Sequence, residues 1–215
     1  MTRRRPRLTV RPTLVEDIPD IIELSRRVYP GSRPWREDQL ANHLAVFPEG
    51  QFVARDTASG TLLGMAASLI LRWDDYDPQQ SWRDFTQLGT FANHDPAGGR
   101  TLYGAEVMVD PAARRRGVGS RLYGAREALV QRLGLRRIRA ASRLRGYGAV
   151  AHRMTAREWV DRVAAGRRSD PTLSFQLRRG FRVLDVVPGY LANDPESLGW
   201  AAVIEWLNPD LPPEP

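Results

Sequence analysis

The sequence predicts an α/β fold in which helices flank a single sheet. Apolar stretches of strand length alternate with segments whose apolar residues recur every three or four positions, as in amphipathic helices. Two strand-like stretches, Gln51 to Arg55 and Thr61 to Leu71, are separated by a Ser59-Gly60 turn and predict an antiparallel hairpin. A strand, a glycine-containing loop and a helix then follow one another between Leu102 and Leu133.

The first elements are a strand and two helices. Leu8 to Arg11 has the length of a short strand. Thr13 and Glu16 have the spacing of a capping box, which predicts the start of a helix. Apolar residues then lie on one helical face from Ile18 to Val28, and a second helix is predicted from Trp35 to Val46.

The glycine loop is followed by an amphipathic helix with core positions at Val118, Leu122, Ala125, Leu129 and Leu133. Its arginines, Arg126 among them, fall largely on other faces of the helix. Beyond it we expect a strand from Ile138 to Ser142, parallel to the strand before the loop, a helix from Thr172 to Arg179 with Asp170 as its N-cap, and strands over Phe181–Val187 and Gly199–Trp206.

We divide the chain into a basic N-terminal arm (1–7), one domain (8–208) and a Pro-rich tail (209–215). Two insertions interrupt the domain, at about 73–100 and 143–169. The first insertion carries aromatic residues that we expect to be buried and a short predicted helix over Gln79–Leu88. It is either a covering flap or one wall of a substrate cleft.

Composition excludes several classes of protein. No run approaches the roughly 18 to 20 apolar residues of a membrane span, and no apolar signal core follows the basic N-terminus. The chain has no cysteine, which excludes disulfides and thiolate nucleophiles and fits the cytoplasm. The three histidines lack ligand-like spacing, so we expect no metal site.

The formal net charge is +7, and all 32 basic residues are arginines. Such a charge is typical of nucleic-acid-binding proteins, so this function is one alternative. The other explanation of the charge is a compositional preference for arginine over lysine, with the arginines spread over a solvated surface. The arginines are scattered and lack the interleaved aromatic residues of a single-strand platform, so we expect no specific nucleic-acid partner.

The segment Arg114-Arg115-Arg116-Gly117-Val118-Gly119 predicts an anion site. Unpaired N–H groups in the first turn of a helix, together with the helix dipole, favour a negative ligand. Gly117 and Gly119 lack a Cβ and allow a phosphate close to the backbone. A pyrophosphate fits such a loop best.

The R-x-x-G-x-G spacing, preceded by Val107-Met108-Val109-Asp110-Pro111, resembles the coenzyme A pyrophosphate loop of the GNAT superfamily of N-acyltransferases. The order of predicted elements also resembles that fold. The resemblance implies a single mixed, mostly antiparallel sheet flanked by helices. In it, the strands ending at Val109 and Ser142 run parallel and splay apart to admit the cofactor.

A second match, Phe175-Gln-Leu-Arg-Arg-Gly180-Phe181, resembles the closing signature of the same family. More narrowly, the segments around Asp170, Glu196 and Trp206 resemble the acyltransferase domain that some bacteria fuse ahead of a carbon–nitrogen hydrolase. The sequence ends just beyond that boundary, so we expect a stand-alone relative or a detached domain. A carbon–nitrogen hydrolase is therefore a candidate partner.

The resemblance implies acetyl-CoA as co-substrate. The backbone of Val107, Met108 and Val109 would contact the pantetheine arm. The residues assigned to the pyrophosphate are Arg114, Arg115, Arg116, Gly117, Val118, Gly119 and Ser120. Many family members also have a tyrosine directly after the helix phenylalanine, where it can protonate the departing thiolate. This chain has Gln176 there, and glutamine is not a proton-donating acid.

Two residues are candidates for catalysis. Strand alternation places Glu106 and Met108 on the face opposite Val107 and Val109, toward the expected cleft, so Glu106 is the leading general base. Its alternative role is a satisfied structural carboxylate of the strand, for example one paired with an arginine. Tyr147, between two glycines, either replaces the missing acid or contacts substrate, or else is a packed tyrosine of the insertion. Weaker candidates are Tyr190 and His152, whereas we expect Asp110 to be a cap and His43 to be structural.

The function expected is an N-acetyltransferase that moves an acetyl group from acetyl-CoA to a small-molecule or peptide amine. Attack would be direct, since no cysteine can carry the acyl group. One alternative is a non-catalytic acyl-CoA-binding module or partner of an amide hydrolase, and another is a nucleic-acid-binding protein. The acceptor and the oligomeric state, including a homodimer, stay open.

Overall fold

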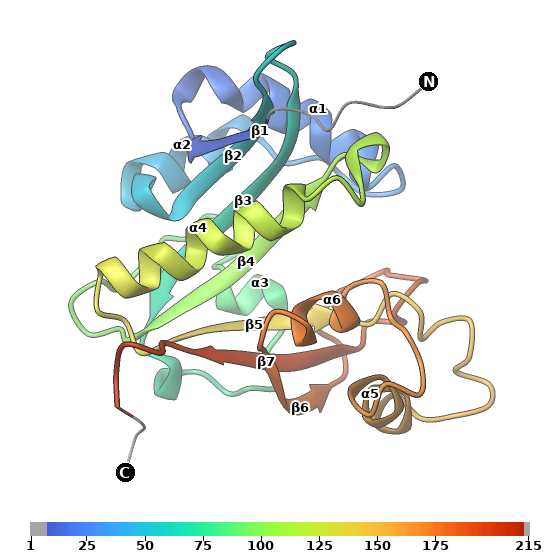
Figure 1. The fold of residues 1–215 in the computed structure, drawn as a ribbon. Helices are drawn as coiled ribbons and strands as arrows, with labels where there is room; N and C mark the ends of the chain where they lie inside the picture. Colours follow the sequence, from blue (N-terminus) through green and yellow to red (C-terminus); the bar gives the residue numbers. More distant parts are fainter. Residues whose placement is uncertain (1–7, 213–215) are drawn as a thin grey trace.

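Seven strands form one mixed sheet in the order β1-β2-β3-β4-β5-β7-β6 (Figure 1). The computed structural model describes residues 8–212. The strands are β1 (Leu8–Pro12), β2 (Gln51–Asp56), β3 (Leu62–Leu71), β4 (Thr101–Val109), β5 (Arg137–Arg143), β6 (Arg182–Val187) and β7 (Ala201–Leu207). Neighbouring strands are antiparallel except β4 and β5, which are parallel. The predicted mixed, mostly antiparallel sheet is confirmed.

Helices cover both faces of this sheet (Figure 1). They are α1 (Ile18–Val28), α2 (Glu37–Val46), α3 (Trp82–Phe85), α4 (Val118–Arg132), α5 (Ala156–Ala164) and α6 (Leu173–Leu177). Apolar side chains of α4, α5 and α6 pack into one core cluster, and those of α1, α2 and α3 pack into the cluster on the other face. The helix predicted after the glycine loop is confirmed.

The two short helices are shorter than predicted. A helix was expected over 79–88, but α3 makes one turn and ends before Gln87 and Leu88, whose φ angles are 44° and 61°. These left-handed conformations cannot continue a helix. The helix expected over 172–179 covers only Leu173–Leu177, and Gly180 with φ 88° follows.

The parallel strands β4 and β5 part soon after they meet. Thr101, Leu102 and Tyr103 pair with residues 137–139, and the rest of β4 does not pair with β5. The parting begins at Gly104, where an added Cβ would still lie 3.5 Å from Ala140 Cβ. Over 104–109, roughly 16 to 20 Å of strand at about 3.3 Å per residue, β4 therefore has an edge that is open toward β5.

The first insertion packs against the sheet beside this edge. Trp82 Nε1 donates to the carbonyl oxygen of Ala105 at 2.9 Å, and Trp82 N donates to the carbonyl oxygen of Tyr190 at 3.0 Å. Phe85 and Phe91 are buried with α1 and α2. The insertion is thus fixed to β4 and to the loop before β7.

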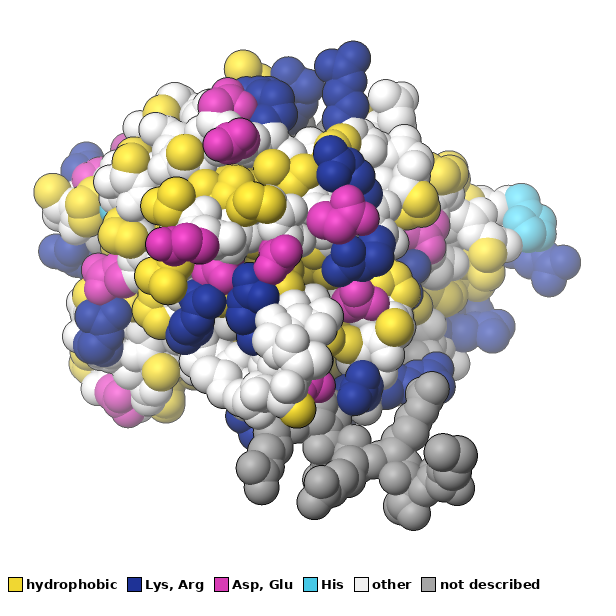
Figure 2. Space-filling view, turned by 90° about the horizontal axis from the view of Figure 1, so that it is seen from above, with side chains coloured by type: hydrophobic (Ala, Val, Ile, Leu, Met, Phe, Trp, Pro, Cys, Tyr) yellow, Lys and Arg dark blue, Asp and Glu magenta, His cyan; other side chains and the backbone are white. Residues whose placement is uncertain are grey.

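The predicted N-terminal arm (1–7) and the last three residues of the predicted tail lie outside the described residues. At the start of the tail, Asp210 accepts a hydrogen bond from Gln131 of α4 at 2.9 Å. Within residues 8–212, no helix is long and apolar enough to cross a membrane. On the face seen from above, acidic and basic side chains lie interspersed and form no continuous basic surface (Figure 2).

Candidate active site

The glycine loop lies between the end of β4 and the start of α4. Asp110 turns the chain here, because its Oδ1 accepts from Ala112 N at 2.8 Å, as a capping residue does. Arg115 and Gly117 have left-handed φ angles of 62° and 84°, and Gly117 is the N-cap of α4. Gly117 can adopt this conformation without a Cβ penalty, and no other atom lies within 4 Å of the position that a Cβ would occupy.

The loop offers unpaired donors and uncompensated charge. The first backbone N–H that bonds within α4 is that of Arg121, to Gly117 O at 3.1 Å. In the described part of the chain, the N–H groups of residues 118–120 donate to no protein atom. The exposed side chains of residues 114–116 have no carboxylate partner there either. This arrangement suits an anion.

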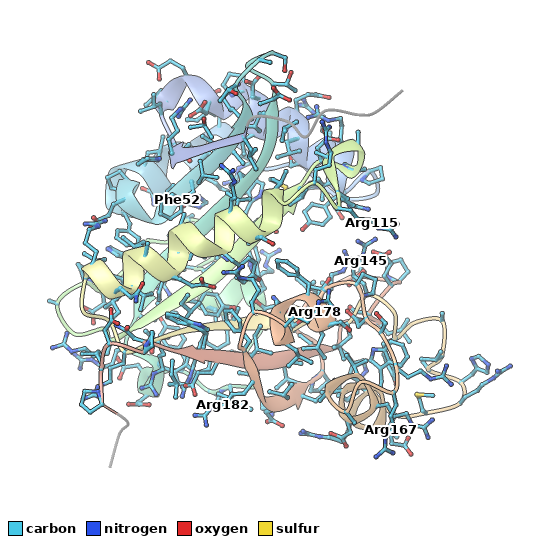
Figure 3. All side chains as sticks on the ribbon, viewed as in Figure 1. Phe52, Arg115, Arg145, Arg167, Arg178 and Arg182 are labelled. Carbon is cyan, nitrogen blue, oxygen red and sulfur yellow. The ribbon has the colours of Figure 1, made fainter. Side chains whose placement is uncertain are left out.

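Two further arginines lie at the same end of the molecule as Arg115. Figure 3 shows Arg115 before α4, Arg145 after β5 and Arg178 at the end of α6 around this end. Arg145 is bound to Glu196 at 2.8 Å, whereas Arg178 is exposed and has no ion pair among residues 8–212. The charges of Arg115 and Arg178 are therefore uncompensated by a carboxylate in the described chain, whereas that of Arg145 is paired.

The open part of β4 presents alternate side chains to the two faces of the sheet. Val107 and Val109 pack against the cluster beneath α4, and Met108 is buried in the cluster beneath α1. The amide N of Val107 donates to Glu106 Oε1 at 3.0 Å. One of the three backbone amides that the resemblance assigns to pantetheine thus has an internal partner.

Glu106 lies on the α1 face, as strand alternation predicts. Tyr29, which follows α1, donates from Oη to Glu106 Oε1 at 2.9 Å. Burial raises the pKa of Glu106 above its usual value, although the hydrogen bonds from Tyr29 and Val107 act in the opposite direction. No arginine is salt-bridged to this carboxylate within the described chain, and Tyr29 and the Val107 amide are its hydrogen-bond partners instead. These contacts fit both a catalytic carboxylate and a satisfied structural one.

An ionic network faces Glu106 from the other side of the opening. Arg143, at the end of β5, binds both Asp194 and Glu196, the latter at 2.6 Å. Its positive charge favours the ionised form of Glu106 and so opposes part of the rise in pKa that burial causes. Residues of β4, α1 and the loop before β7 therefore enclose one polar site.

The helical pattern predicts the wrong environment for Arg126. Its side chain, expected largely on another face, is 1% exposed and extends beneath α4. Nε donates to Ser68 Oγ at 2.8 Å, and Nη2 donates to the carbonyl oxygens of Ala67 at 2.6 Å and Glu106 at 2.5 Å. Among the described residues no acceptor binds Nη1, which lies 3.1 Å from the position of a Cβ on Gly104. The guanidinium therefore occupies the closed end of the opening between β4 and β5.

The other tyrosine candidates lie apart from Glu106 or are committed elsewhere. Tyr147 is 6% exposed and packs edge-on against Trp200, and no contact within residues 8–212 joins it to Glu106. The hydroxyl of Tyr190 forms a buried hydrogen bond with that of Tyr103 at 2.5 Å. Its pKa is well above the usual value because the phenol is buried. The structure thus does not bring Tyr147 to the predicted base.

Two of the three histidines have structural contacts. His43 is buried, stacks on Phe91 and bonds through Nε2 to Gly89 O at 2.8 Å. His94 Nδ1 accepts from Ile70 N at 3.0 Å, and His152 is exposed. Within residues 8–212 no group of acidic, histidine or cysteine side chains could hold a metal ion.

Gln176 has an unexpected partner. Its Nε2 donates to Tyr123 Oη at 2.7 Å, and both side chains are buried. Tyr123 belongs to α4, 53 residues earlier in the chain. No periodic or motif signal predicts this pair, because a tyrosine on the inner side of an amphipathic helix has the same pattern as any core residue.

Comparisons with known proteins agree with this geometry. A sequence profile of the "Acetyltransferase (GNAT) family" matches residues 18–154. The chain is 35% identical over 210 residues to "Uncharacterized N-acetyltransferase YkwB" of Bacillus subtilis (strain 168), and the match covers 96% of this chain and 91% of that protein.

A second relative is longer than this chain. The chain is 41% identical over 214 residues to "Probable hydrolase YhcX" of the same organism, covering 100% of this chain but 41% of that protein. Among solved structures, the loading GNATL domain of CurA from Lyngbya majuscula superposes with a TM-score of 0.77 at 18% identity, covering 95% of this chain and 99% of that one. The last match shows the shared fold.

Proposed function

Because the chain belongs to the acetyltransferase (GNAT) family and is an acyltransferase, we propose that it transfers an acetyl group from acetyl-CoA to an amine. The observation that carries the proposal is the open edge of β4 leading from the glycine loop to Glu106. A cofactor whose pyrophosphate lies on residues 117–120 would extend its pantetheine arm along this edge. Its thioester would then lie near Glu106 and Arg126.

Glu106 is the general base in this proposal. Acyl transfer requires a neutral amine, and a carboxylate whose pKa is raised by burial accepts a proton more readily than an exposed one. Tyr29 holds the carboxylate in place through its hydrogen bond. Attack of the amine on the thioester is direct, since the chain has no cysteine to form an acyl-enzyme.

The experiment that tests the proposal measures acetyl-CoA binding and turnover together. Calorimetric titration with acetyl-CoA should give saturable binding below millimolar concentrations. A screen of small-molecule and peptide amines should then reveal one that triggers release of CoA. Binding without turnover for every amine would favour a non-catalytic acyl-CoA-binding module instead.

A hydrolase is the first candidate partner to test, because the chain is 41% identical to a longer relative that is named a probable hydrolase. Nucleic acid is the competing partner suggested by the net charge of +7. Counterion release predicts that any such binding weakens steeply with salt, with a slope of about −0.9 per neutralised phosphate on duplex DNA. Sub-micromolar binding of nucleic acid at physiological salt, with no acetyl-CoA binding, would reverse the ranking.

A further inference from the structure

We propose that Tyr123 donates the proton to the CoA sulfur, with Gln176 holding its hydroxyl in position. This inference rests on the proposed acyl transfer and names the acid that Gln176 itself cannot be. Tyr123 is a buried residue of α4, 5% exposed, and belongs to neither of the two sequence motifs.

The position of Tyr123 relative to the opening comes from its neighbours. Helix α4 packs on the first half of the sheet, where Val118 and Leu122 approach Gly64 of β3 so closely that a Cβ would lie 2.8 Å and 3.2 Å from them. Tyr123 instead packs edge-on against Phe175 and Phe181 of the second half, with ring centroids 5.4 Å and 5.7 Å apart. Its side chain therefore bridges the two halves where β4 and β5 part.

The same helix leads from the glycine loop to the closed end of the opening. Gly119 lies next to Phe175, Tyr123 follows about one turn later, and Arg126 reaches Gly104 after nearly one turn more. A pantetheine arm that starts at the loop and runs along β4 would pass these three residues in that order. The sulfur, at the end of the arm, would reach the depth of Tyr123 and Arg126.

The phenol has a proton to give. Its oxygen accepts from Gln176 Nε2 at 2.7 Å, and no acceptor for its own hydrogen is found among residues 8–212. Two buried polar atoms, Gln176 Oε1 and Ser142 Oγ, have no hydrogen-bond partner among residues 8–212. Ser142 lies on the same face of β5 as Ile138 and Ala140. Buried polar atoms are usually satisfied, so these orphans are consistent with a polar ligand in this space.

The charges around the phenol suit a proton donor. Burial raises the pKa of Tyr123, which keeps it protonated near neutral pH. The guanidinium groups of Arg126 and Arg179 lie 5.7 Å and 5.9 Å from the ring centroid, and Arg179 is paired with Glu127. These cations stabilise the negative charge that forms on sulfur and then on the phenolate.

The step balances as follows. The amine nitrogen forms a bond to the acyl carbon and the C–S bond breaks, with its electron pair going to sulfur. The proton of Tyr123 Oη moves to that sulfur and yields the CoA thiol. The proton lost by the amine goes to the Glu106 carboxylate and returns through solvent to the Tyr123 phenolate.

The first test does not require turnover. The rate at which iodoacetamide alkylates enzyme-bound CoA is measured against pH, because only the thiolate reacts. A hydrogen bond from Tyr123 stabilises the bound thiolate, so the thiolate fraction at neutral pH should fall about tenfold in Tyr123→Phe. Tyr76→Phe, on the opposite face of the sheet, is the matched control and should leave the profile unchanged.

The second test uses turnover with the best amine. Tyr123→Phe should lower kcat by about 100-fold, leave KM for acetyl-CoA nearly unchanged and remove the alkaline decline of the pH profile. Tyr123→Phe with Gln176→Tyr should recover activity, since a phenol is restored beside the same site. An alkylation profile that is identical in wild type and Tyr123→Phe would overturn the proposal.

The experiments distinguish a failure of the proposed acetyl transfer from a failure of the proposed role of Tyr123. If CoA binds and Tyr123→Phe changes its alkylation, yet no amine releases CoA, acetyl transfer fails while the contact of Tyr123 with sulfur stands. If amines release CoA and Tyr123→Phe retains full activity, only the role of Tyr123 is overturned. Absence of CoA binding would overturn both.

Discussion

Tyr29 Oη donates a hydrogen bond to Glu106 Oε1 at 2.9 Å, although the two residues are 77 positions apart. The contact joins the end of α1 to the open part of β4 and fixes a carboxylate whose pKa is raised by burial. In the proposed mechanism Glu106 can act as the base only when it is deprotonated. Activity should therefore rise as the pH rises through the elevated pKa of Glu106.

Glu106→Gln should lower kcat by about 100-fold and remove the acid limb of the pH–rate profile. Tyr29→Phe removes a donor that favours the carboxylate, so the acid limb should move to higher pH. The measurement is kcat/KM against pH, with Glu49→Gln, an exposed carboxylate bound to Arg132, as control. An unchanged profile in Glu106→Gln would remove Glu106 as the base.

Arg115→Ala should weaken CoA binding about fivefold, the effect of losing roughly 1 kcal/mol from a solvated charge contact. Arg167→Ala is the matched control, because Arg167 is an exposed arginine that Figure 3 places far from the glycine loop. Calorimetric titration of both variants with CoA checks this. Equal affinities would mean that Arg115 does not contact the cofactor.

Arg126→Met should destabilise the fold by about 3 kcal/mol, since Ala67 O, Glu106 O and Ser68 Oγ would lose their buried donor. Arg132→Met, on the exposed side of the same helix, should change stability by less than about 0.5 kcal/mol. Urea unfolding followed by circular dichroism measures both. A small effect at Arg126 would show that the sheet closes around the missing guanidinium.

Stability should fall as the pH is lowered from about 6.5 to about 4. Burial lowers the pKa of His43 to about 4, so the unfolded chain binds a proton in this window that the folded chain excludes. The difference corresponds to about 3 kcal/mol at the lower limit. His94, whose pKa burial also lowers, contributes in the same direction. His43→Gln should flatten the dependence of unfolding free energy on pH, and an unaltered slope would contradict this assignment.

Local patterns predicted the elements near the site well. The helix after the glycine loop, the hairpin and the parallel partner strand each have a strong periodic or turn signal, and all are present. The capping box at Thr13 and Glu16 was wrong. Thr13 Oγ1 has no hydrogen-bond partner in the described chain, and Asp17 accepts from Leu14 N at 2.8 Å instead, held by Arg11 and Arg55. Ion pairs with Arg11 and Arg55 thus hold Asp17 at the start of α1, a contact that local spacing does not reveal.

The parts of the site that escaped prediction are tertiary contacts. Arg126 is buried because it finds backbone acceptors on β3 and β4, which a helical wheel cannot show. No sequence signal separates the roles of Tyr147 and Tyr123. Tyr147, in the second insertion, packs against Trp200, whereas Tyr123 binds Gln176. Periodicity assigns a residue to the core but does not reveal which polar group it meets there.

Calorimetric titration of the protein with acetyl-CoA tests the central claim most directly. The geometry of the glycine loop and of the open edge of β4 predicts saturable binding of one acetyl-CoA per chain below millimolar concentrations. Arg115→Ala should weaken this binding while Arg167→Ala leaves it unchanged. No saturable heat up to millimolar acetyl-CoA would contradict the account.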